Sequence, residues 1–495
     1  MPGSEPILLH PDDDVVILTA RRGAVPMGHK LARHALAQGS PVRKFGQVIG
    51  YATTPVAADE HVHSHNLAIG AHDRGYNAGA DLARAQAAVA AIPPATFRGY
   101  ARADGRVGTR NFVALCATVN CSVSVIRLAA EELRLEGAFV GYSNVDGVFA
   151  LAHGTGCGMA DNGPGWDNLQ RVLWGYATHP NVGAAVFVGL GCEVMQVARM
   201  KALFGASGQE RFHGLTIQET GGTRATIDAI KRKVRDLLPQ VNAAPRSDCP
   251  ASMLTVALQC GGSDGYSGIT ANPALGIAAD RLVAMGGAVI LSETPEIYGA
   301  EHLLIRRAVN DAVADKLLDR IRWWEGYTAL NGASMDNNPS PGNKAGGLTT
   351  ILEKSLGAAA KAGAAPLSDV LGYAEQIRGR GLIFMDTPGY DPVSVTGQVA
   401  GGAQLVVFTT GRGSAFGSKP APTLKLATND RLFAAMPDDM DLNCGDIVSA
   451  GVPIPQKGAE ILARILAVAS GEATRSEAQG LGDHEILPWQ IGAVM

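Results

Sequence analysis

The sequence predicts an α/β protein with a small β-rich domain at the N-terminus and two further α/β domains with mainly parallel sheets. Three observations support this prediction. The 495 residues correspond to about three domains at roughly 100–200 residues each. Short β-branched runs and turns dominate residues 1–66. From Thr96 onward, apolar runs alternate with longer helical patterns, which is typical of βα units.

Changes in composition indicate the domain boundaries. Residues 1–66 form the β-rich domain, and residues 67–98 form a linker that contains a helical part, is rich in Ala, Gly, Asp and Arg, and ends near Pro93-Pro94. Proline stops a helix because it lacks the backbone N–H. A second boundary falls near residues 245–250, where a charged helix gives way to a proline-containing segment. We therefore expect a central domain over 99–245 and a C-terminal domain over 246–495.

Charge and composition limit the class of partner. The chain carries 42 Lys and Arg against 46 Asp and Glu and has no basic run, so a nucleic-acid partner has no electrostatic footprint. It has no uncharged apolar stretch of 18 residues and no basic segment leading into an apolar run at the N-terminus, so we expect neither a membrane span nor a secretory signal. These features favour a cytoplasmic protein that acts on a small molecule, and a homo-oligomer stays open.

Polar loops follow seven predicted buried strands. Such loops at the carboxyl ends of parallel strands form the usual ligand site of open α/β sheets. A single glycine-rich loop can equally be a turn that needs positive φ, but the repetition along the chain favours a site. The strands are Phe112–Leu115, Val145–Leu151, Ala184–Leu190, Met253–Leu258, Ala288–Leu291, Leu382–Met385 and Leu405–Phe408.

The densest group of histidines lies at the end of the first domain. His61, His63 and His65 alternate along the chain, so in an extended segment their imidazoles project from one face. Such a face can ligate a metal, polarise a hydroxyl or bind a carboxylate, and the alternative is a solvated strand edge. His29 lies in the same domain as a base or a further ligand, or as a residue of a helix N-terminus.

The cysteines indicate a second type of metal site. Seven cysteines, an odd number, favour free thiols or metal ligation over a disulfide framework. Cys157, Cys192 and Cys260 each follow a predicted strand. If those strands are neighbours, the three thiolates could hold an iron–sulfur cluster, with Cys121 as a fourth ligand. The alternative is that these residues are small apolar side chains in crowded loops.

Two further loops suit an anionic substrate. Residues 338–347 combine turn residues with Asn343 and Lys344, whose amide and ammonium groups can bind a carboxylate or polyol. Arg412 lies in a Thr-Gly-Arg-Gly loop and can bind a carboxylate with two parallel hydrogen bonds. The chain has no Walker A loop, no G-x-S-x-G elbow and no dinucleotide fingerprint. No motif therefore supports a P-loop nucleotide-binding protein, a serine hydrolase or a Rossmann dehydrogenase.

Eight motifs make the sequence resemble the altronate/galactarate dehydratase family of sugar-acid hydro-lyases, nearly from end to end. The resemblance implies an N-terminal β-clip domain of the SAF type followed by α/β domains. It also implies iron-dependent loss of water from an aldonate or aldarate, without naming which sugar acid. The motifs are Gly28–Lys30, Phe45–Ala52, Arg102–Asn111, Gly189–Glu193, Gln259–Gly265, Gly268–Pro273, Asn338–Gly347 and Thr410–Gly413.

The implied chemistry assigns roles to these residues. Dehydration of a 2,3-dihydroxy acid needs a base for the C2 proton, a cation for the carboxylate and an acid for the departing C3 hydroxyl. We expect His29, His61 and His63 to be catalytic, with His61 and His63 on the metal. Fe²⁺ is the expected metal, with Mn²⁺ or an iron–sulfur cluster as alternatives. The residues expected to bind substrate are Lys30, His65, Asn272, Asn343, Lys344 and Arg412.

Two other functions stay open at this point. A related lyase could eliminate sulfite from sulfolactate, because that reaction begins with the same α-proton abstraction. A sugar-acid-binding protein without activity is the other alternative, although it would not need reactive side chains in so many strand-end loops.

Overall fold

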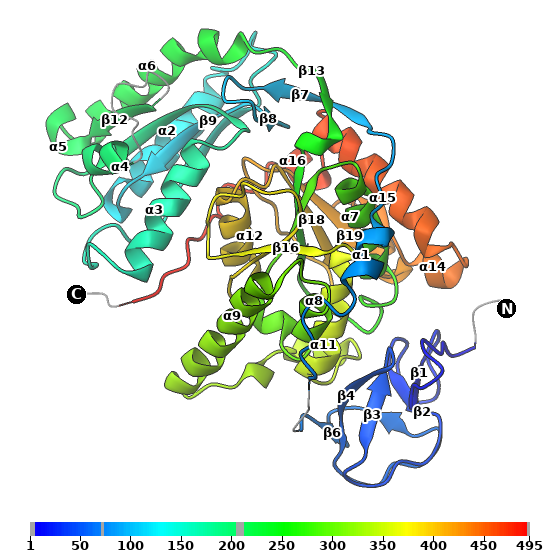
Figure 1. Cartoon of the computed structure of the whole chain (residues 1–495). Helices are drawn as coiled ribbons and strands as arrows, with labels where there is room; N and C mark the ends of the chain where they lie inside the picture. Colours follow the sequence, from blue (N-terminus) through cyan, green and yellow to red (C-terminus); the bar gives the residue numbers. More distant parts are fainter. Residues whose placement is uncertain (1–4, 71–73, 204–211, 493–495) are drawn as a thin grey trace.

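The computed structural model describes residues 5–70, 74–203 and 212–492. It contains three domains, and the C-terminal domain lies between the other two (Figure 1). The N-terminal domain packs against one end of it, next to α8 and α11, and the central domain packs against the other side, next to α12 and α16. Within these described ranges, no helix combines the length and apolarity needed to cross a membrane.

The N-terminal domain consists of two small antiparallel sheets, as the β-rich prediction requires. One contains β1 (Val15–Ile17), β2 (Lys30–Ala32) and β5 (His61–Val62), and the other contains β3 (Pro41–Lys44), β4 (Gln47–Ala52) and β6 (Leu67–Ala68). Its apolar core continues into the C-terminal domain, because Ala300, Leu356 and Ala359 belong to the same buried cluster. The two domains therefore share one core.

The described part of the linker contains the helical segment that its composition predicts, and its last residues, from Thr96, already belong to a strand. It includes α1 (Leu82–Ala88) and leads into β7 (Thr96–Ala101) and β8 (Val107–Gly108). The second predicted boundary forms β13 (Ser247–Pro250), which pairs antiparallel with β7 so that Gly99 lies opposite Ser247. The chain thus enters and leaves the central domain through two adjacent strands.

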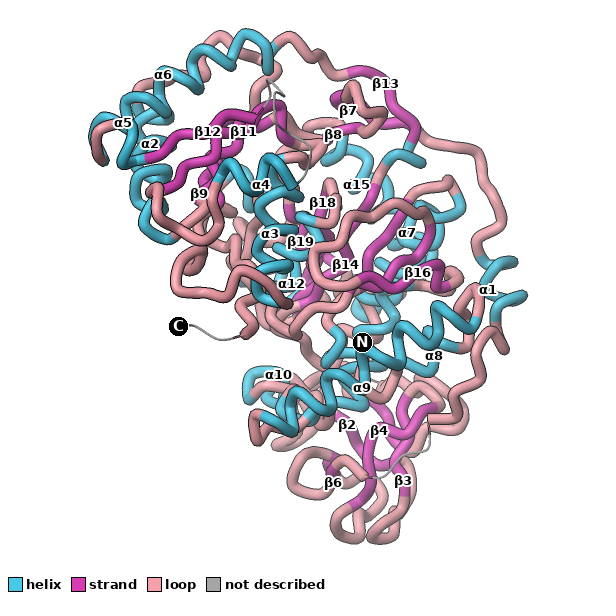
Figure 2. The backbone as a smooth tube through the Cα atoms, turned by 60° about the vertical axis from the view of Figure 1, so that its left-hand side comes forward, coloured by secondary structure: helices cyan, strands magenta, loops and turns pink. Residues whose placement is uncertain are grey.

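The central domain has a four-stranded parallel sheet in the order β10-β9-β11-β12. Helices α2 and α6 cover one face and α3 covers the other (Figure 2). The elements are β9 (Phe112–Ala117), α2 (Val123–Leu135), β10 (Gly147–Leu151), α3 (Pro164–Ala177), β11 (Val182–Gly189), α4 (Val197–Leu203), β12 (Phe212–Thr216), α5 (Ile217–Thr220) and α6 (Thr223–Asn242).

The C-terminal domain has a seven-stranded parallel sheet in the order β16-β17-β15-β14-β18-β19-β20. Helices α7, α9 and α15 cover one face and α12 covers the other. The chain passes from β14 to β15 on one side and later places β18 on the other side of β14. This is a topological switch point, where open α/β sheets bind ligands beyond the strand ends.

The strands of this sheet are β14 (Thr255–Cys260), β15 (Ala288–Leu291), β16 (Leu367–Leu371), β17 (Gly381–Met385), β18 (Leu405–Thr410), β19 (Thr423–Ala427) and β20 (Leu442–Asn443). The helices are α7 (Ala271–Ala284), α8 (Glu301–Ile305), α9 (Asp311–Leu330), α10 (Pro341–Ala345), α11 (Ile351–Ala359), α12 (Asp391–Ala400), α13 (Asp430–Ala435), α14 (Asp446–Ser449), α15 (Ile454–Ala469) and α16 (Arg475–Ala478). Short 3₁₀ turns occupy Asn120–Ser122, Ala251–Met253, Thr294–Ile297, Met335–Asn337 and Ala360–Ala362.

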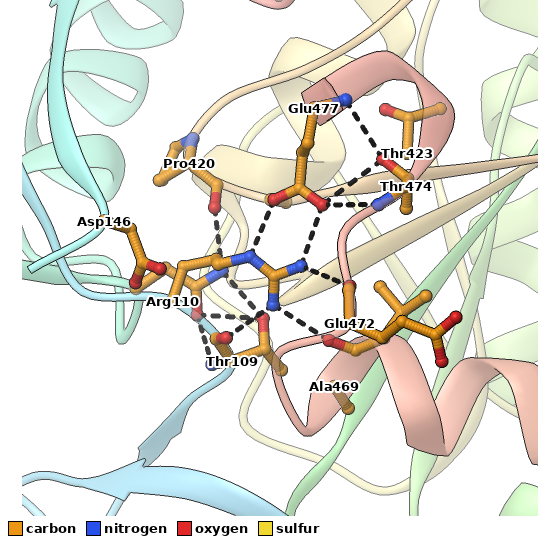
Figure 3. Close-up of polar contacts among 12 residues, drawn as sticks. Thr109, Arg110, Asp146, Pro420, Thr423, Ala469, Glu472, Thr474 and Glu477 are labelled. Carbon is orange, nitrogen blue, oxygen red and sulfur yellow. Dashed lines mark hydrogen bonds and ion pairs between the residues drawn. The ribbon is translucent and has the colours of Figure 1, made fainter. Parts of the chain in front are cut away.

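Polar contacts tie the central domain to the C-terminal domain (Figure 3). The Arg110 guanidinium donates to both carboxylate oxygens of Glu477 on α16, at 2.6 and 2.8 Å, and to the carbonyl oxygens of Val468 and Glu472. Nearby, His179 donates from Nε2 to the carbonyl oxygen of Ala403 at 2.9 Å. The Arg102–Asn111 motif therefore builds an interface between domains.

Candidate active site between the N-terminal and C-terminal domains

Three of the eight sequence motifs meet where the N-terminal domain packs on the C-terminal domain. The Gly265 N–H donates to the carbonyl oxygen of Gly346 at 2.8 Å. A Cβ atom at Gly265 would lie 2.1 Å from the carbonyl oxygen of Gly28, and one at Gly347 would lie 2.6 Å from it. Glycine is required here because the three backbones approach too closely for any side chain.

A buried triad of charges holds this interface together. Lys30 on β2 donates from Nζ to both carboxylate oxygens of Glu353 on α11, at 2.8 and 3.0 Å, and to the carbonyl oxygen of Gly347 at 2.7 Å. Lys44 on β3 donates to the same carboxylate at 2.9 Å. Burial lowers the pKa of Lys30 to about 8. Burial would raise the pKa of Glu353, but the two lysines hold it well below its usual value.

The predicted histidines come together beside this triad. The rings of His29, His61, His63 and His65 have neighbouring centroids 5.1–5.5 Å apart. The loop of residues 338–347 covers them from the C-terminal domain. His63 Nε2 lies 2.9 Å from the carbonyl oxygen of Lys344, and His29 Nε2 lies 3.3 Å from that of Ala345. The alternating spacing in the sequence was therefore a sound guide to the shared face, although β5 itself covers only His61 and Val62.

These contacts determine which ring nitrogens carry protons. A carbonyl oxygen only accepts, so both Nε2 atoms that face carbonyls are donors. The opposite nitrogen, Nδ1, then carries a lone pair in His29 and in His63. His29 Nδ1 lies 3.0 Å from His61 Nε2, and His63 Nδ1 lies 3.0 Å from the Ser64 hydroxyl. Burial lowers the pKa of His29 and of His61 to about 4 and also lowers that of His63, so these imidazoles are neutral at physiological pH.

Neutral imidazoles of this kind fit a divalent metal. Histidine binds metals through an unprotonated nitrogen, and a ligating ring usually donates its other N–H to a carbonyl or carboxylate. His29 shows this arrangement, with Nε2 facing Ala345. The 3.0 Å between His29 Nδ1 and His61 Nε2 is also the separation of two adjacent ligands at about 2.1 Å from one octahedral ion. The imidazole donors therefore suit a divalent transition metal.

Three residues expected to bind substrate have hydrogen-bond partners within the protein. All three Lys30 donors already have acceptors. Asn272 donates to the carbonyl oxygen of Gly357 at 2.8 Å and accepts from the Thr409 hydroxyl at 2.6 Å. Asn343 forms the capping box of α10 with Ser340 and donates to the carbonyl oxygen of Ser263. Their polar groups have partners within the protein, and the substrate-binding roles of these three residues stay predictions.

The remaining predicted contacts lie near the surface. Lys344 is half-buried on α10, directly behind the carbonyl oxygen that His63 faces, and His65 is exposed at the rim of the histidine cluster. Arg412 is exposed on the loop after β18, and its backbone N–H donates to the carbonyl oxygen of Gly262. These three side chains are the ones still available to a carboxylate.

The three proposed cluster cysteines do not converge. Cys157 and Cys192 are exposed on loops after β10 and β11 in the central domain. Cys260 ends β14 in the other sheet, where it is buried and accepts a hydrogen bond from Lys361 Nζ at 2.8 Å. The condition that their strands are neighbours is therefore not met for Cys260, and a cluster held by these three thiolates needs correction.

Sequence reasoning missed the partners of Cys260. Glu293 and Glu296 lie close to it at the end of β15, and Lys354 on α11 pairs with Glu296. The position of Glu293 just after a predicted strand could have indicated that it lies near Cys260. Lys354 and Lys361 could not be predicted as partners, because they lie about a hundred residues further along the chain and a single sequence does not show which elements their helical segments contact.

The fold and the histidine cluster between two domains are those of a candidate enzyme. Family comparisons give the same conclusion more specifically. The SAF domain of altronate/galactarate dehydratases matches residues 18–70, the second domain of D-galactarate dehydratase/altronate hydrolase matches 99–242, and the C-terminal domain of D-galactarate/altronate dehydratase matches 251–494. The chain belongs to this family, which makes it a carbon–oxygen lyase of the hydro-lyase class.

Curated relatives match almost the whole chain. Altronate dehydratase of Escherichia coli is 36% identical over 464 residues, covering 92% of this chain and 90% of the relative. Altronate dehydratase of Bacillus subtilis is 34% identical over 453 residues, covering 92% and 89%. The galactarate dehydratase (L-threo-forming) of Escherichia coli is 34% identical over 472 residues, covering 92% and 88%.

Proposed function

We propose that the protein dehydrates an aldonate or aldarate to a 2-keto-3-deoxy acid at the interface between its N-terminal and C-terminal domains. The observation that carries this proposal is the group of neutral imidazoles gathered around the 3.0 Å contact between His29 and His61. The altronate and galactarate dehydratases at 34–36% identity support this substrate class.

The metal is assigned to His29 Nδ1 and His61 Nε2, with Fe²⁺ proposed and Mn²⁺ as the alternative. A divalent metal there would supply a Lewis acid that stabilises negative charge on the substrate carboxylate. His63 lies beside this pair, and its Nδ1 atom, which accepts a hydrogen bond from the Ser64 hydroxyl, can accept a proton. This assignment exchanges the roles of His29 and His63 relative to the sequence-based expectation, because it is His29 whose Nδ1 lies 3.0 Å from His61 Nε2.

The protein groups then carry the proton steps. His63, neutral because burial lowers its pKa, takes the C2 proton of the bound acid. The C3 hydroxyl leaves with a proton returned by the imidazolium, so the proton balance closes as water is released. The resulting enol tautomerises to the 2-keto-3-deoxy acid. Lys344 and Arg412, the accessible cations of this region, are assigned to the carboxylate groups of the substrate.

A substrate panel tests the proposal. The metal-loaded protein would be incubated anaerobically with aldonates, aldarates and sulfolactate, and 2-keto acid and sulfite would be measured. We expect 2-keto acid from at least one sugar acid, and we expect chelation to abolish it and Fe²⁺ to restore it. Sulfite release from sulfolactate alone, or undiminished turnover after exhaustive metal removal, would overturn the assignment.

The sulfo-lyase alternative is less favoured than dehydration, because dehydratases match 92% of the chain at 34–36% identity. The third alternative, a binding protein without activity, conflicts with the membership in a hydro-lyase family. A cytoplasmic location and a homo-oligomeric state stay predictions.

A further inference from the structure

A second cluster of polar side chains lies buried at the carboxyl ends of β14 and β15. Cys260 Sγ and one carboxylate oxygen each from Glu293 and Glu296 all lie within 4.8 Å of one another, and all three residues are buried. Cys260 Sγ and Glu296 Oε2 are 3.8 Å apart. None of these groups belongs to the histidine site, although both sites lie beyond the strand ends of the C-terminal sheet.

The carboxylate of Glu293 lacks the partners that a buried carboxylate requires. Glu293 is 1% exposed, and neither of its carboxylate oxygens has a hydrogen bond. Lys361 Nζ lies 3.8 Å from one of them, beyond hydrogen-bond distance. Asn338 points its Nδ2 at Glu296 from 2.8 Å, and its own buried Oδ1 is also without a partner. A buried polar group left unpaired costs about 1–3 kcal/mol, so this arrangement calls for a ligand.

The charges in the cluster do not cancel. The Cys260 thiolate and the carboxylates of Glu293, Glu296 and Asp391 carry four negative charges when ionised, and Lys354 and Lys361 carry two positive charges. The difference is two negative charges in a buried site, where uncompensated charge is unfavourable. Burial raises the pKa of the Cys260 thiol to about 11, that of Asp391 to about 7 and that of Glu293 well above its usual value. Protons therefore neutralise part of this charge when no cation is bound, and a bound cation would have to displace them.

We propose that Cys260, Glu293 and Glu296 bind a divalent transition-metal cation at a site distinct from the histidine cluster. A thiolate among the ligands favours Zn²⁺, Fe²⁺ or Co²⁺ over Mg²⁺ and Ca²⁺. Lys361, which donates to Cys260 Sγ at 2.8 Å, would favour the thiolate form that metals require. The surplus of two negative charges matches one divalent ion.

Helix α11 carries residues that contact both sites. Glu353 on α11 pairs with Lys30 beside the histidines, and its neighbour Lys354 pairs with Glu296. The loop that carries Asn338, which contacts Glu296, also carries the carbonyl groups that contact His29 and His63. A cation at the second site would therefore fix the segments that cover the histidines.

Cobalt is the probe that separates the two sites. Metal-free protein would be titrated with Co²⁺, and bound metal and near-ultraviolet absorbance would be recorded. A thiolate ligand produces a sulfur-to-cobalt charge-transfer band, whereas imidazole and carboxylate ligands do not. We expect this band to saturate at about one Co²⁺ per chain. Cys260→Ser should remove it, and Glu293→Gln should weaken the Co²⁺ affinity at least tenfold. His61→Ala should retain it.

The controls make each outcome decisive. Cys116→Ser replaces another buried cysteine, in the central sheet among apolar residues, and should keep the band. Co²⁺ binding to folded wild-type protein without the band would overturn the proposal, as would a band that survives in Cys260→Ser. If Cys260→Ser does not fold, unchanged Co²⁺ affinity in folded Glu293→Gln overturns it. If His61→Ala loses activity but keeps the charge-transfer band, the result supports a metal site at Cys260 that is separate from the histidine site.

Discussion

The C-terminal domain makes two interfaces of different character. Toward the central domain, Arg110, Glu477 and His179 have their polar groups satisfied by side chains or by backbone carbonyls. Toward the N-terminal domain, the three donors of Lys30 have acceptors, but His29 Nδ1 and His61 Nε2 contact each other at 3.0 Å and not a carbonyl or carboxylate. Both interfaces are rich in motif residues. The comparison indicates that a polar interface is a candidate for chemistry where some ring nitrogens lack a carbonyl or carboxylate partner. Where every polar group has such a partner, the interface is structural.

The largest expected effect separates the two kinds of buried histidine. His61→Ala should lower kcat by about two to four orders of magnitude, the range for a lost proton-transfer or ligand group. His179→Gln, at the other interface, is the matched control and should change kcat less than threefold at neutral pH. Steady-state kinetics on sugar acids with Fe²⁺ present would measure both. Equal losses in the two variants would erase the functional distinction between the interfaces.

The second prediction compares the ion pairs of the interfaces. Glu353→Gln leaves Lys30 and Lys44 buried without a charged partner, which should destabilise the fold by about 3–5 kcal/mol. Glu477→Gln should cost less, about 1–3 kcal/mol, because Arg110 keeps its backbone acceptors and Glu477 is partly exposed. Denaturant unfolding followed by circular dichroism would measure the two. The reverse order would show that the Arg110 contacts carry more of the stability.

The third prediction tests the close approach of the backbones. Gly265→Ala places a methyl group against the carbonyl oxygen of Gly28 and should destabilise the domain contact by about 1–3 kcal/mol, with at least a tenfold loss in kcat/KM. Gly326→Ala is the control, because Gly326 lies within α9 with nothing inside 4 Å of the added atom. It should stabilise the protein by up to about 1 kcal/mol. Full activity in Gly265→Ala would mean that the domains tolerate separation.

The smallest effect concerns pH and the structural interface. Burial lowers the pKa of His179 from 6.5 to about 3, so the unfolded chain takes up a proton before the folded one as pH falls. The stability contribution of neutral His179 is complete above pH 6.5 and is lost between pH 6.5 and about 3, by at most about 1.4 kcal/mol per pH unit. His179→Gln should therefore flatten the decline in thermal midpoint from pH 6.5 to 4.5. An unchanged decline would contradict this.

The sequence allowed the parallel sheets to be predicted wherever apolar runs were continuous. β12 was missed because Gly214 and His213 interrupt it, and β19 was missed because Lys425 lies at its centre. That lysine is fully buried and donates to the carbonyl oxygen of Ser414 at 2.9 Å. A single sequence shows a charged residue within the apolar run, but it does not show the hydrogen-bond acceptor that offsets the cost of burying that residue.

The candidate site, like the sheets, could be predicted only where the pattern is local in the sequence. The alternation of His61, His63 and His65 reflects local geometry, so it could be recognised directly. The position of Lys30 next to His29 placed it beside the imidazoles, but its partner Glu353 lies 323 positions away and could not be predicted. Residue type and local spacing predict which groups are reactive, whereas hydrogen-bond partners that are distant in sequence decide which of them stay available.

The pairing of β7 with β13 has a consequence for the modularity of this chain. The polypeptide enters and leaves the central domain through strands that lie side by side, with Thr96 opposite Pro250. An inserted unit whose two ends meet can be gained, exchanged or lost without displacing the flanking parts. A change in the length or sequence of the central domain would therefore leave the contact between the N-terminal and C-terminal domains in place.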